Sequence, residues 1–391
     1  MRSHPVSLGF IPLIDAAPLI IAHEMGYAHE EGLDLTLSRA PSWSALRDML
    51  RLGRVDAAHM LAPVPVAAAL GLGGVEEKLS AVSVLSVNGN VIGVSRALAA
   101  RLRDQGHSFG FDDAWDAGRA LIAAADKPLR IGVPFPFSMH AELVYYWLKA
   151  LGMPAPEGLI VRVVPPPHMG EAIRAGEIDA FCVGEPWGSH SVESGVGELL
   201  LPCSRIWAFA PEKVLAVRDA WIEQEPRVVQ ALIRALWRAG RWLANPSSRA
   251  LATELLSRSQ WLNLPAELLD RALSGTFVTS PDGTMRRTSG FVEFHRGAAN
   301  FPWRSQAEWI ASRLANRVGL DPDQAAEKAR STFRSDIYRA AMANTGADLP
   351  GASAKLEGAL SEDTPVASRA GRLILPRDCF FNGEIFEPLL K

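Results

Sequence analysis

One short pattern occurs twice in this chain, as "MLRLGRVDAAHM" at 49–60 and as "AIRAGEIDAFCV" at 172–183. Each copy combines the end of an apolar-periodic helix, a glycine that can end that helix, an acidic residue and a short apolar strand. Around both copies the order is strand, helix and strand, which is typical of a parallel sheet covered by helices. The repetition therefore predicts two similar α/β units.

Local signals around the first copy favour the same interpretation. "PVSLGFI" is typical of a buried strand, a helix is expected from near Pro18 to the glycines at 26–32, and "LDLTLSRA" is the next expected strand. Ser42 can cap the following helix, which we expect to end at Gly53. Further along, "LRIGVPFPFSMHAELVYYWLKALGM" repeats the order of strand, loop and helix.

The length of 391 residues exceeds what one hydrophobic core usually spans, so we expect two lobes. The expected division is 1–90 for the first part of lobe 1, 91–203 for lobe 2, 204–345 for a return to lobe 1 followed by a helical region, and 346–391 for a C-terminal extension. In the return segment, "IWAFAPEKVLAV" is expected to form a strand, a turn and a strand. Four tryptophans are expected to pack between elements of the helical region, namely Trp237, Trp242, Trp261 and Trp309.

Charge and cysteine content exclude several classes of protein. The net charge is −3 at pH 7 and the basic residues are spread along the chain, which argues against nucleic acid or an anionic membrane as the main partner. Cys182, Cys203 and Cys379 are far apart and odd in number, so neither a disulfide framework nor a metal site is expected. The apolar runs are too short to cross a bilayer. Because the N-terminus enters a strand without a secretory leader, we expect a cytoplasmic protein.

Signatures of enzymes are weak. The sequence has no Walker A loop, no dinucleotide-binding G-x-G-x-x-G, no H-E-x-x-H and no G-x-S-x-G motif. The glycine-rich "LGLGG" at 70–74 follows an expected helix, so it indicates a helix end rather than a phosphate-binding loop. A nucleophile pair of Cys182 and His140 is conceivable, although a small buried cysteine is the commoner case. We therefore expect no catalytic residue, no metal and no cofactor.

Several residues lie at turns that would face a cleft between the two units. Such sheets bind ligands beyond the carboxyl ends of their strands, so two units predict a shared crevice. His140 begins a helix, where free backbone N–H groups favour an anion. Trp43 could wall a pocket, and Gly184 would permit close approach of a ligand to the backbone. Lys213 is either a solvated turn residue or a buried charge that awaits an anion. Capping, core packing and ordinary turns are the alternatives.

Five segments together resemble a known family, and they are "LGFIPLIDAAPLIIAHEMGY", "SWSALRDMLRLGRVDAAHMLAPVPVAAALGLGG", "FCVGEPW", "PEKVLAV" and "NFPW". In this order, over nearly the whole chain, they are similar to the nitrate and bicarbonate solute-binding proteins of ABC transporters. The resemblance implies a periplasmic-binding-protein-like fold of type II, with two α/β lobes around a ligand cleft, a hinge and a helical C-terminal part.

The resemblance also implies a set of binding residues. Nitrate-binding members of the family hold the anion with a tryptophan, a glutamine, a histidine, a glycine and a lysine, which fall on Trp43, Asn90, His140, Gly184 and Lys213. Asn90 departs from the family, because it is shorter than glutamine. Bicarbonate-binding members carry an acidic residue and a metal ion at the lysine position, so Lys213 favours nitrate or nitrite.

The expected location resembles one branch of the family, the cytoplasmic nitrate/nitrite sensors of nitrate assimilation operons. Membership of this branch implies an ANTAR-type RNA-binding antiterminator protein as the partner, released when nitrate closes the lobes, with no direct contact to nucleic acid or membrane. Two alternatives stay open. One is a transport binding protein whose leader is missing from the sequence, and the other is an enzyme of the same fold that acts on a small heterocycle.

Overall fold

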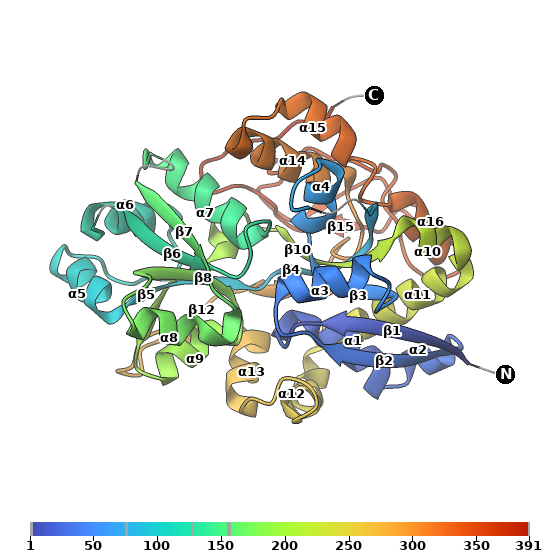
Figure 1. Cartoon of the computed structure of the whole chain (residues 1–391), viewed down its shortest axis with the longest axis horizontal. Coiled ribbons are helices and arrows are strands. Elements are labelled where there is room, and N and C mark those ends of the chain that lie inside the picture. Colours follow the sequence, from blue (N-terminus) through green and yellow to red (C-terminus); the bar gives the residue numbers. More distant parts are fainter. Residues whose placement is uncertain (1–2, 75–76, 127, 155–157, 390–391) are drawn as a thin grey trace.

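Two β-sheets, each accompanied by helices, organise the molecule (Figure 1). The computed structural model describes residues 3–74, 77–126, 128–154 and 158–389. Within these ranges, we call the six-stranded sheet with its helices lobe 1 and the five-stranded sheet with its helices lobe 2.

The sheet of lobe 1 mixes parallel and antiparallel strands. In spatial order they are β13 (Val292–Glu293), β4 (Leu79–Asn88), β10 (Pro211–Arg218), β3 (Ala57–Leu61), β1 (His4–Phe10) and β2 (Leu33–Arg39). β1 is parallel to β2 and β3, whereas β10 is antiparallel to β3 and β4. The turn that we expected within "PEKV" is therefore wrong, because Pro211 and Lys213 lie in a buried strand in the middle of the sheet. Of the two alternatives for Lys213, the structure shows the buried charge.

The sheet of lobe 2 begins directly after β4. In spatial order its strands are β7 (Leu159–Val163), β6 (Leu129–Val133), β8 (Ala180–Gly184), β5 (Asn90–Ser95) and β9 (Gly197–Pro202). Gly89, with φ of +102°, separates β4 from β5 in a backbone conformation that suits glycine. β5 runs antiparallel to β8 and places Asn90 opposite Gly184. We keep the lobe boundaries expected from the sequence as a proposal.

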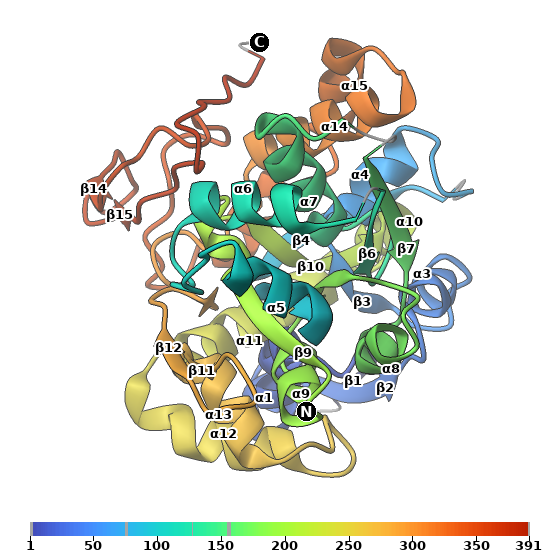
Figure 2. The same cartoon turned by 90° about the vertical axis from the view of Figure 1, so that its left-hand side faces the viewer.

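Helices cover both sheets, as Figures 1 and 2 show. Between β1 and β4 the helices are η1 (Ile14–Ala16), α1 (Ala17–Glu24), α2 (Tyr27–Glu30), α3 (Trp43–Arg51) and α4 (Pro63–Ala69). Between β5 and β10 they are α5 (Arg96–Asp104), α6 (Ala114–Ala124), α7 (Met139–Ala150), η2 (Pro166–His168), α8 (Met169–Arg174), α9 (Trp187–Glu193) and η3 (Cys203–Arg205). After β10 they are α10 (Asp219–Gln224), α11 (Pro226–Leu243), η4 (Pro246–Ser248), α12 (Arg249–Ser257), α13 (Ala266–Ser274), α14 (Arg304–Val318), α15 (Pro322–Ala329) and α16 (Ser335–Met342).

The repeated sequence pattern forms the same local structure in both lobes. α3 and α8 are each followed by a glycine with φ of +68°. In both lobes, the next aspartate accepts a hydrogen bond from a residue of the neighbouring strand that lies 49 positions earlier in the chain. The backbone N–H of Ser7 donates to Asp56 Oδ2 at 2.8 Å, and that of Arg130 donates to Asp179 Oδ2 at 3.0 Å. The carboxylate therefore ties β3 to β1 and β8 to β6, so the prediction of two similar units is confirmed.

The region 226–345 is less uniformly helical than we expected. β11 (Thr276–Val278) and β12 (Met285–Arg287) form an antiparallel pair, and β13 joins the sheet of lobe 1. Trp261 and Trp309 are buried as predicted, whereas Trp237 and Trp242 are only partly buried. The Trp237 ring packs against the edge of the core and against the partly buried His295 ring, with the ring centres 5.4 Å apart.

The C-terminal segment 349–389 contacts both lobes and includes the strand pair β14 (Thr364–Pro365) and β15 (Ile374–Leu375) (Figure 2). The ring of Phe380 stacks on Trp309 of α14 with a centroid distance of 5.7 Å. Tyr146 of α7, in lobe 2, donates its hydroxyl hydrogen to Asn382 Oδ1 at 2.8 Å. This segment is therefore packed onto the molecule as an ordered part of its structure.

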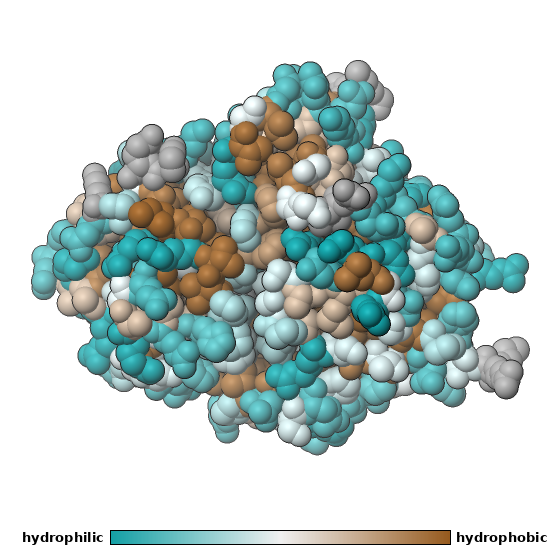
Figure 3. Space-filling view, viewed as in Figure 1, coloured by the Kyte–Doolittle hydropathy of each residue, from teal (hydrophilic) through white to brown (hydrophobic). Residues whose placement is uncertain are grey.

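The surface over β7 is apolar. β7 is one of the two edge strands of its sheet, and Ile160 and Val163 are 39% and 53% exposed. Figure 3 shows hydrophobic residues gathered over this strand, at the upper left.

In the described part of the chain, no helix combines the length and the apolar character needed to cross a membrane.

Candidate functional site

Lys213 is the centre of a buried polar cluster between the two lobes. Its side chain is 0% exposed, although a lysine is rarely buried without partners. Nζ lies 2.7 Å from Asp15 Oδ2 and 2.8 Å from Glu212 Oε1. Asp15 belongs to η1 and Glu212 to β10, so the lysine is held by one carboxylate from another element and one from its own strand.

Two aromatic rings of lobe 1 lie beside this lysine. Ser42 caps α3 by accepting a hydrogen bond from the N–H of Ala45, as predicted, and Trp43 is the first residue of that helix. The centre of the Trp43 ring lies 5.5 Å from Lys213 Nζ, within the range of a cation–π contact. It also lies 5.6 Å from the ring of His59, whose Nε2 is 2.9 Å from Asp15 Oδ1.

His140 enters the cluster from lobe 2. Ser138 caps α7 by accepting a hydrogen bond from the N–H of Ala141, and His140 lies in the first turn of that helix. The His140 ring is completely buried, and its Nδ1 lies 3.3 Å from Glu212 Oε1. A single carboxylate therefore lies next to both the lysine of lobe 1 and the histidine of lobe 2.

Asn90 and Gly184 complete the set on neighbouring strands of lobe 2. A Cβ atom built on Gly184 would lie 3.4 Å from Leu13 Cδ2, 3.5 Å from Asn90 Oδ1 and 3.7 Å from Asp15 Oδ2. Any side chain larger than alanine would consequently extend into the cluster. The structure thus brings together all five residues that the family resemblance implied, Trp43, Asn90, His140, Gly184 and Lys213.

Several polar groups around Lys213 have no hydrogen-bond partner among the described residues. Within the described part of the chain, the indole N–H of Trp43 and Nε2 of His140 make no hydrogen bond, although both are buried, and the Asn90 amide lies close enough to Glu212 to lower the pKa of that carboxyl group. Buried polar groups normally have partners, so unpartnered groups that gather at one place need an explanation. A ligand that accepts hydrogen bonds would satisfy them.

Burial and neighbouring charges set the protonation of the cluster. Burial alone would raise the pKa of Asp15, but Lys213 and His59 outweigh it and hold the pKa below its ordinary value. Burial alone would lower the pKa of Lys213, but Asp15 and Glu212 raise it. Burial and the nearby Lys213 lower the pKa of His140 well below its usual range, so this ring is neutral near pH 7. Burial raises the pKa of Glu212 to about 7, against the opposing effect of Lys213.

Asp15, His59 and Glu212 were not among the residues predicted from the sequence. Asp15 lies just before the helix that is expected from near Pro18, and Glu212 lies in the turn that is expected within "PEKV". The sequence did contain a signal for His59, which is its place in the repeated pattern. His59 lies in the strand of the first copy, just as Cys182 and Gly184 lie in the strand of the second copy.

The alternative nucleophile Cys182 lacks the surroundings of a reactive thiol. Burial and the nearby Cys203 raise its pKa well above the ordinary value, which disfavours the thiolate. Its Sγ lies 3.5 Å from Cys203 Sγ. Among the described residues, no group of His, Cys, Asp and Glu is arranged to hold a metal ion.

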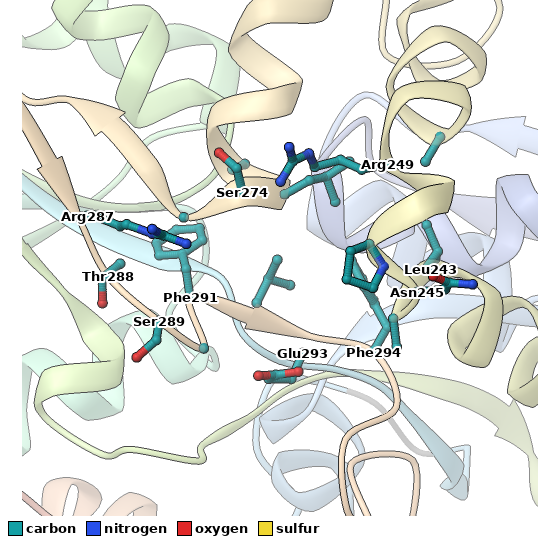
Figure 4. Close-up of a pocket in the computed structure, with 18 residues that line it drawn as sticks. Leu243, Asn245, Arg249, Ser274, Arg287, Thr288, Ser289, Phe291, Glu293 and Phe294 are labelled. Atoms are coloured by element: carbon teal, nitrogen blue, oxygen red, sulfur yellow. The ribbon is translucent and has the colours of Figure 1, made fainter.

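A separate surface pocket of about 240 Å³ lies among α11, α12, α13 and β13 (Figure 4). It is lined by Arg249, Arg287 and Glu293 but by none of the predicted residues. Arg249 is paired with Asp270 at 3.1 Å, on the surface. The buried cluster around Lys213 is therefore the stronger candidate for a binding site.

Burial of glutamates gives the protein a testable pH dependence. Burial raises the pKa of Glu142, Glu185 and Glu212 to about 7 each. The ordinary pKa of a glutamate is near 4.5, so between pH 4.5 and pH 7 the folded state binds more protons than the unfolded state. The free energy of unfolding therefore falls as the pH rises through this range. The melting temperature should be a few degrees lower at pH 8 than at pH 5.5. Glu185→Gln should reduce this difference, whereas the exposed Glu267→Gln should not; an equal difference in both variants would contradict the assignment.

Two α/β lobes with a buried polar cluster between them define a solute-binding protein fold. Residues 2–257 match the model of the NMT1-like family, so the chain belongs to that family. It is similar to the nitrate/nitrite binding protein NrtA of Nostoc sp. (strain PCC 7120), with 30% identity over 391 residues that cover 97% of this chain and 82% of that protein.

Two further relatives extend the comparison. The nitrate import ATP-binding protein NrtC of Synechocystis sp. (strain PCC 6803) is 32% identical over 351 residues, covering 88% of this chain and 51% of NrtC, so the chain spans about half the length of that relative. The crystal structure of the periplasmic nitrate-binding protein NrtA from Synechocystis PCC 6803 superposes with a TM-score of 0.84 at 26% identity, covering 99% of this chain and 96% of that one. The periplasmic-binding-protein-like fold implied by the sequence is thereby confirmed.

Proposed function

We propose that the protein binds nitrate or nitrite in the cluster around Lys213. The observation that carries this proposal is the buried ammonium group of Lys213, which lies beside the unpartnered indole N–H of Trp43, the buried amide of Asn90 and the buried ring of His140. The names of relatives such as the nitrate/nitrite binding protein NrtA support the same class of ligand.

The chemistry of these groups suits a small monovalent anion. Nitrate is planar and weakly hydrated, so a lysine, an indole N–H and an amide can compensate for the water that it loses. Charge-assisted hydrogen bonds from Lys213 would supply most of the attraction. Sulfate and phosphate carry more charge and need more donors than the described cluster offers. We propose no cofactor, no metal and no catalytic residue.

Calorimetric titration with nitrate, nitrite, bicarbonate and sulfate tests this function. We expect saturable binding of nitrate or nitrite and no binding of sulfate. Bicarbonate is also expected to bind poorly, because the cluster presents a lysine and, in the described residues, no group of metal ligands. Absence of both nitrate and nitrite binding would refute the proposal.

The finer proposal is a cytoplasmic sensor rather than a transport component. In this role the anion would stabilise the closed lobes, and an ANTAR-type RNA-binding antiterminator protein would bind one lobe arrangement only. The C-terminal segment supports this role, because Phe380 packs on Trp309 while Asn382 contacts Tyr146 of lobe 2. Lobe movement would thus alter the surface around this segment. Direct contact with nucleic acid or membrane is not part of the proposal.

A transport binding protein is the second candidate, and the structural likeness to the periplasmic nitrate-binding protein NrtA favours it. Size-exclusion chromatography with the antiterminator of the same organism separates the two. A sensor should form a complex that nitrate dissociates. A transport protein should form no complex at any nitrate concentration, and that result would refute the sensor role while leaving nitrate binding intact.

A further inference from the structure

The charges of the cluster present a difficulty for anion binding. Asp15, Glu212 and Lys213 are all buried and in contact, so two carboxylates accompany a single ammonium group when Glu212 is ionised. The described cluster then carries a net charge of −1 before any anion arrives. A nitrate ion would raise this to −2 in a buried site, where like charges repel strongly.

We propose that the anion enters together with one proton and that Glu212 holds this proton. This inference rests on the proposed nitrate site and adds a residue to it. Protonation converts the Glu212 carboxylate into a neutral carboxyl group that can also donate a hydrogen bond. The proton comes from solvent, and no covalent bond to the anion is formed.

The contacts identify Glu212, rather than Asp15, as the proton acceptor. Asp15 has two basic partners, since Oδ2 lies 2.7 Å from Lys213 Nζ and Oδ1 lies 2.9 Å from His59 Nε2. Both oxygens of Asp15 therefore favour the charged form. Glu212 contacts Lys213 through Oε1 alone, and the neutral amide of Asn90, rather than a second basic group, is the other partner that favours its charged form.

The other titratable groups around Glu212 do not replace it. His140 of α7 lies 3.3 Å from Oε1, but it also lies in the field of Lys213, which lowers its pKa. Burial lowers the pKa of His59 of β3 as well, and that ring faces Asp15. Cys182 of β8 keeps its proton, because burial raises its pKa. Burial raises the pKa of Glu212 to about 7, so the proton can be gained and lost near neutral pH.

Proton uptake has a measurable effect on nitrate affinity. Above pH 7 the carboxylate must be protonated before the anion binds, so the affinity should fall by about tenfold per pH unit. Below pH 6 the affinity should be constant. Titrations at pH 8.5 in two buffers with different ionisation enthalpies should show the uptake of nearly one proton per nitrate bound.

Glu212→Gln isolates the role of this residue. Glutamine is neutral at every pH and similar in shape, so this variant should bind nitrate with an affinity that does not change between pH 6 and 9. Glu293→Gln is the matched control, because burial also raises the pKa of Glu293, on β13 and outside the cluster. This control should keep the pH dependence of the unmodified protein.

The outcomes separate the two proposals. Nitrate binding with no pH dependence and no proton uptake in the unmodified protein would overturn the role of Glu212 while leaving the anion site intact. No nitrate binding at any pH would refute the anion site itself. If Glu212→Gln does not fold, the proton count in the unmodified protein still decides the question.

Discussion

Replacing Lys213 with methionine should abolish measurable nitrate binding and destabilise the protein by about 3–5 kcal/mol. Methionine keeps much of the volume but supplies neither charge nor donor. Asp15 would lose the ammonium group 2.7 Å away, and its completely buried carboxylate would keep only His59 as a partner. Calorimetric titration and urea unfolding measure the two effects separately.

Two further variants separate binding from stability. Lys213→Met combined with Asp15→Asn removes the orphaned carboxylate, so it should recover much of the lost stability without recovering nitrate binding. Lys355→Met is the matched control, because Lys355 is another mostly buried lysine and lies 2.6 Å from Glu357 in the C-terminal segment. It should destabilise the fold but leave nitrate affinity unchanged. Nitrate binding of ordinary strength in Lys213→Met would contradict the role assigned to Lys213.

The α/β architecture could be predicted because its signals are local. Glycines after helices, serine caps such as Ser42 and Ser138, and the repeated aspartate each act within a few residues of the element that they shape. The repeated pattern was especially informative, since Asp56 and Asp179 make the same contact in both lobes. The five proposed binding residues came from resemblance to a family, and the structure adds that they lie together.

The environment of Lys213 could not be predicted, because it depends on residues that are distant in sequence. A proline and a lysine between apolar runs are typical of a turn, so the sequence leaves Lys213 open between a turn residue and a buried charge. The segment is nevertheless a central strand, since Asp15 and Glu212 compensate for the buried charge. Asp15 precedes β10 by almost two hundred positions, so no local pattern connects it to Lys213.

Replacing Arg317 with methionine should lower nitrate affinity by about tenfold, which corresponds to about 1.4 kcal/mol. Arg317 of α14 donates to Glu142 Oε1 of α7 at 2.7 Å and to the backbone oxygen of Pro136 at 3.0 Å. α14 also packs against α4 of lobe 1, so this arginine links the two lobes. His140 is in the same first turn of α7 as Glu142. Loss of the link should therefore disfavour the closed arrangement in which His140 meets Glu212, and titration with nitrate measures the change.

The matched control for this link is Arg296→Met. The ion pair of Arg296 with Asp363 is about half exposed, and exposed pairs contribute little to stability, so affinity and melting temperature should both stay nearly constant.

Glu142 is 2% exposed, so removing Arg317 should also raise the pKa of Glu142 further and leave it protonated. The combined variant Arg317→Met with Glu142→Gln should then be no less stable than Arg317→Met alone, yet bind nitrate just as weakly. Ordinary nitrate affinity in either variant would show that closure does not depend on this contact.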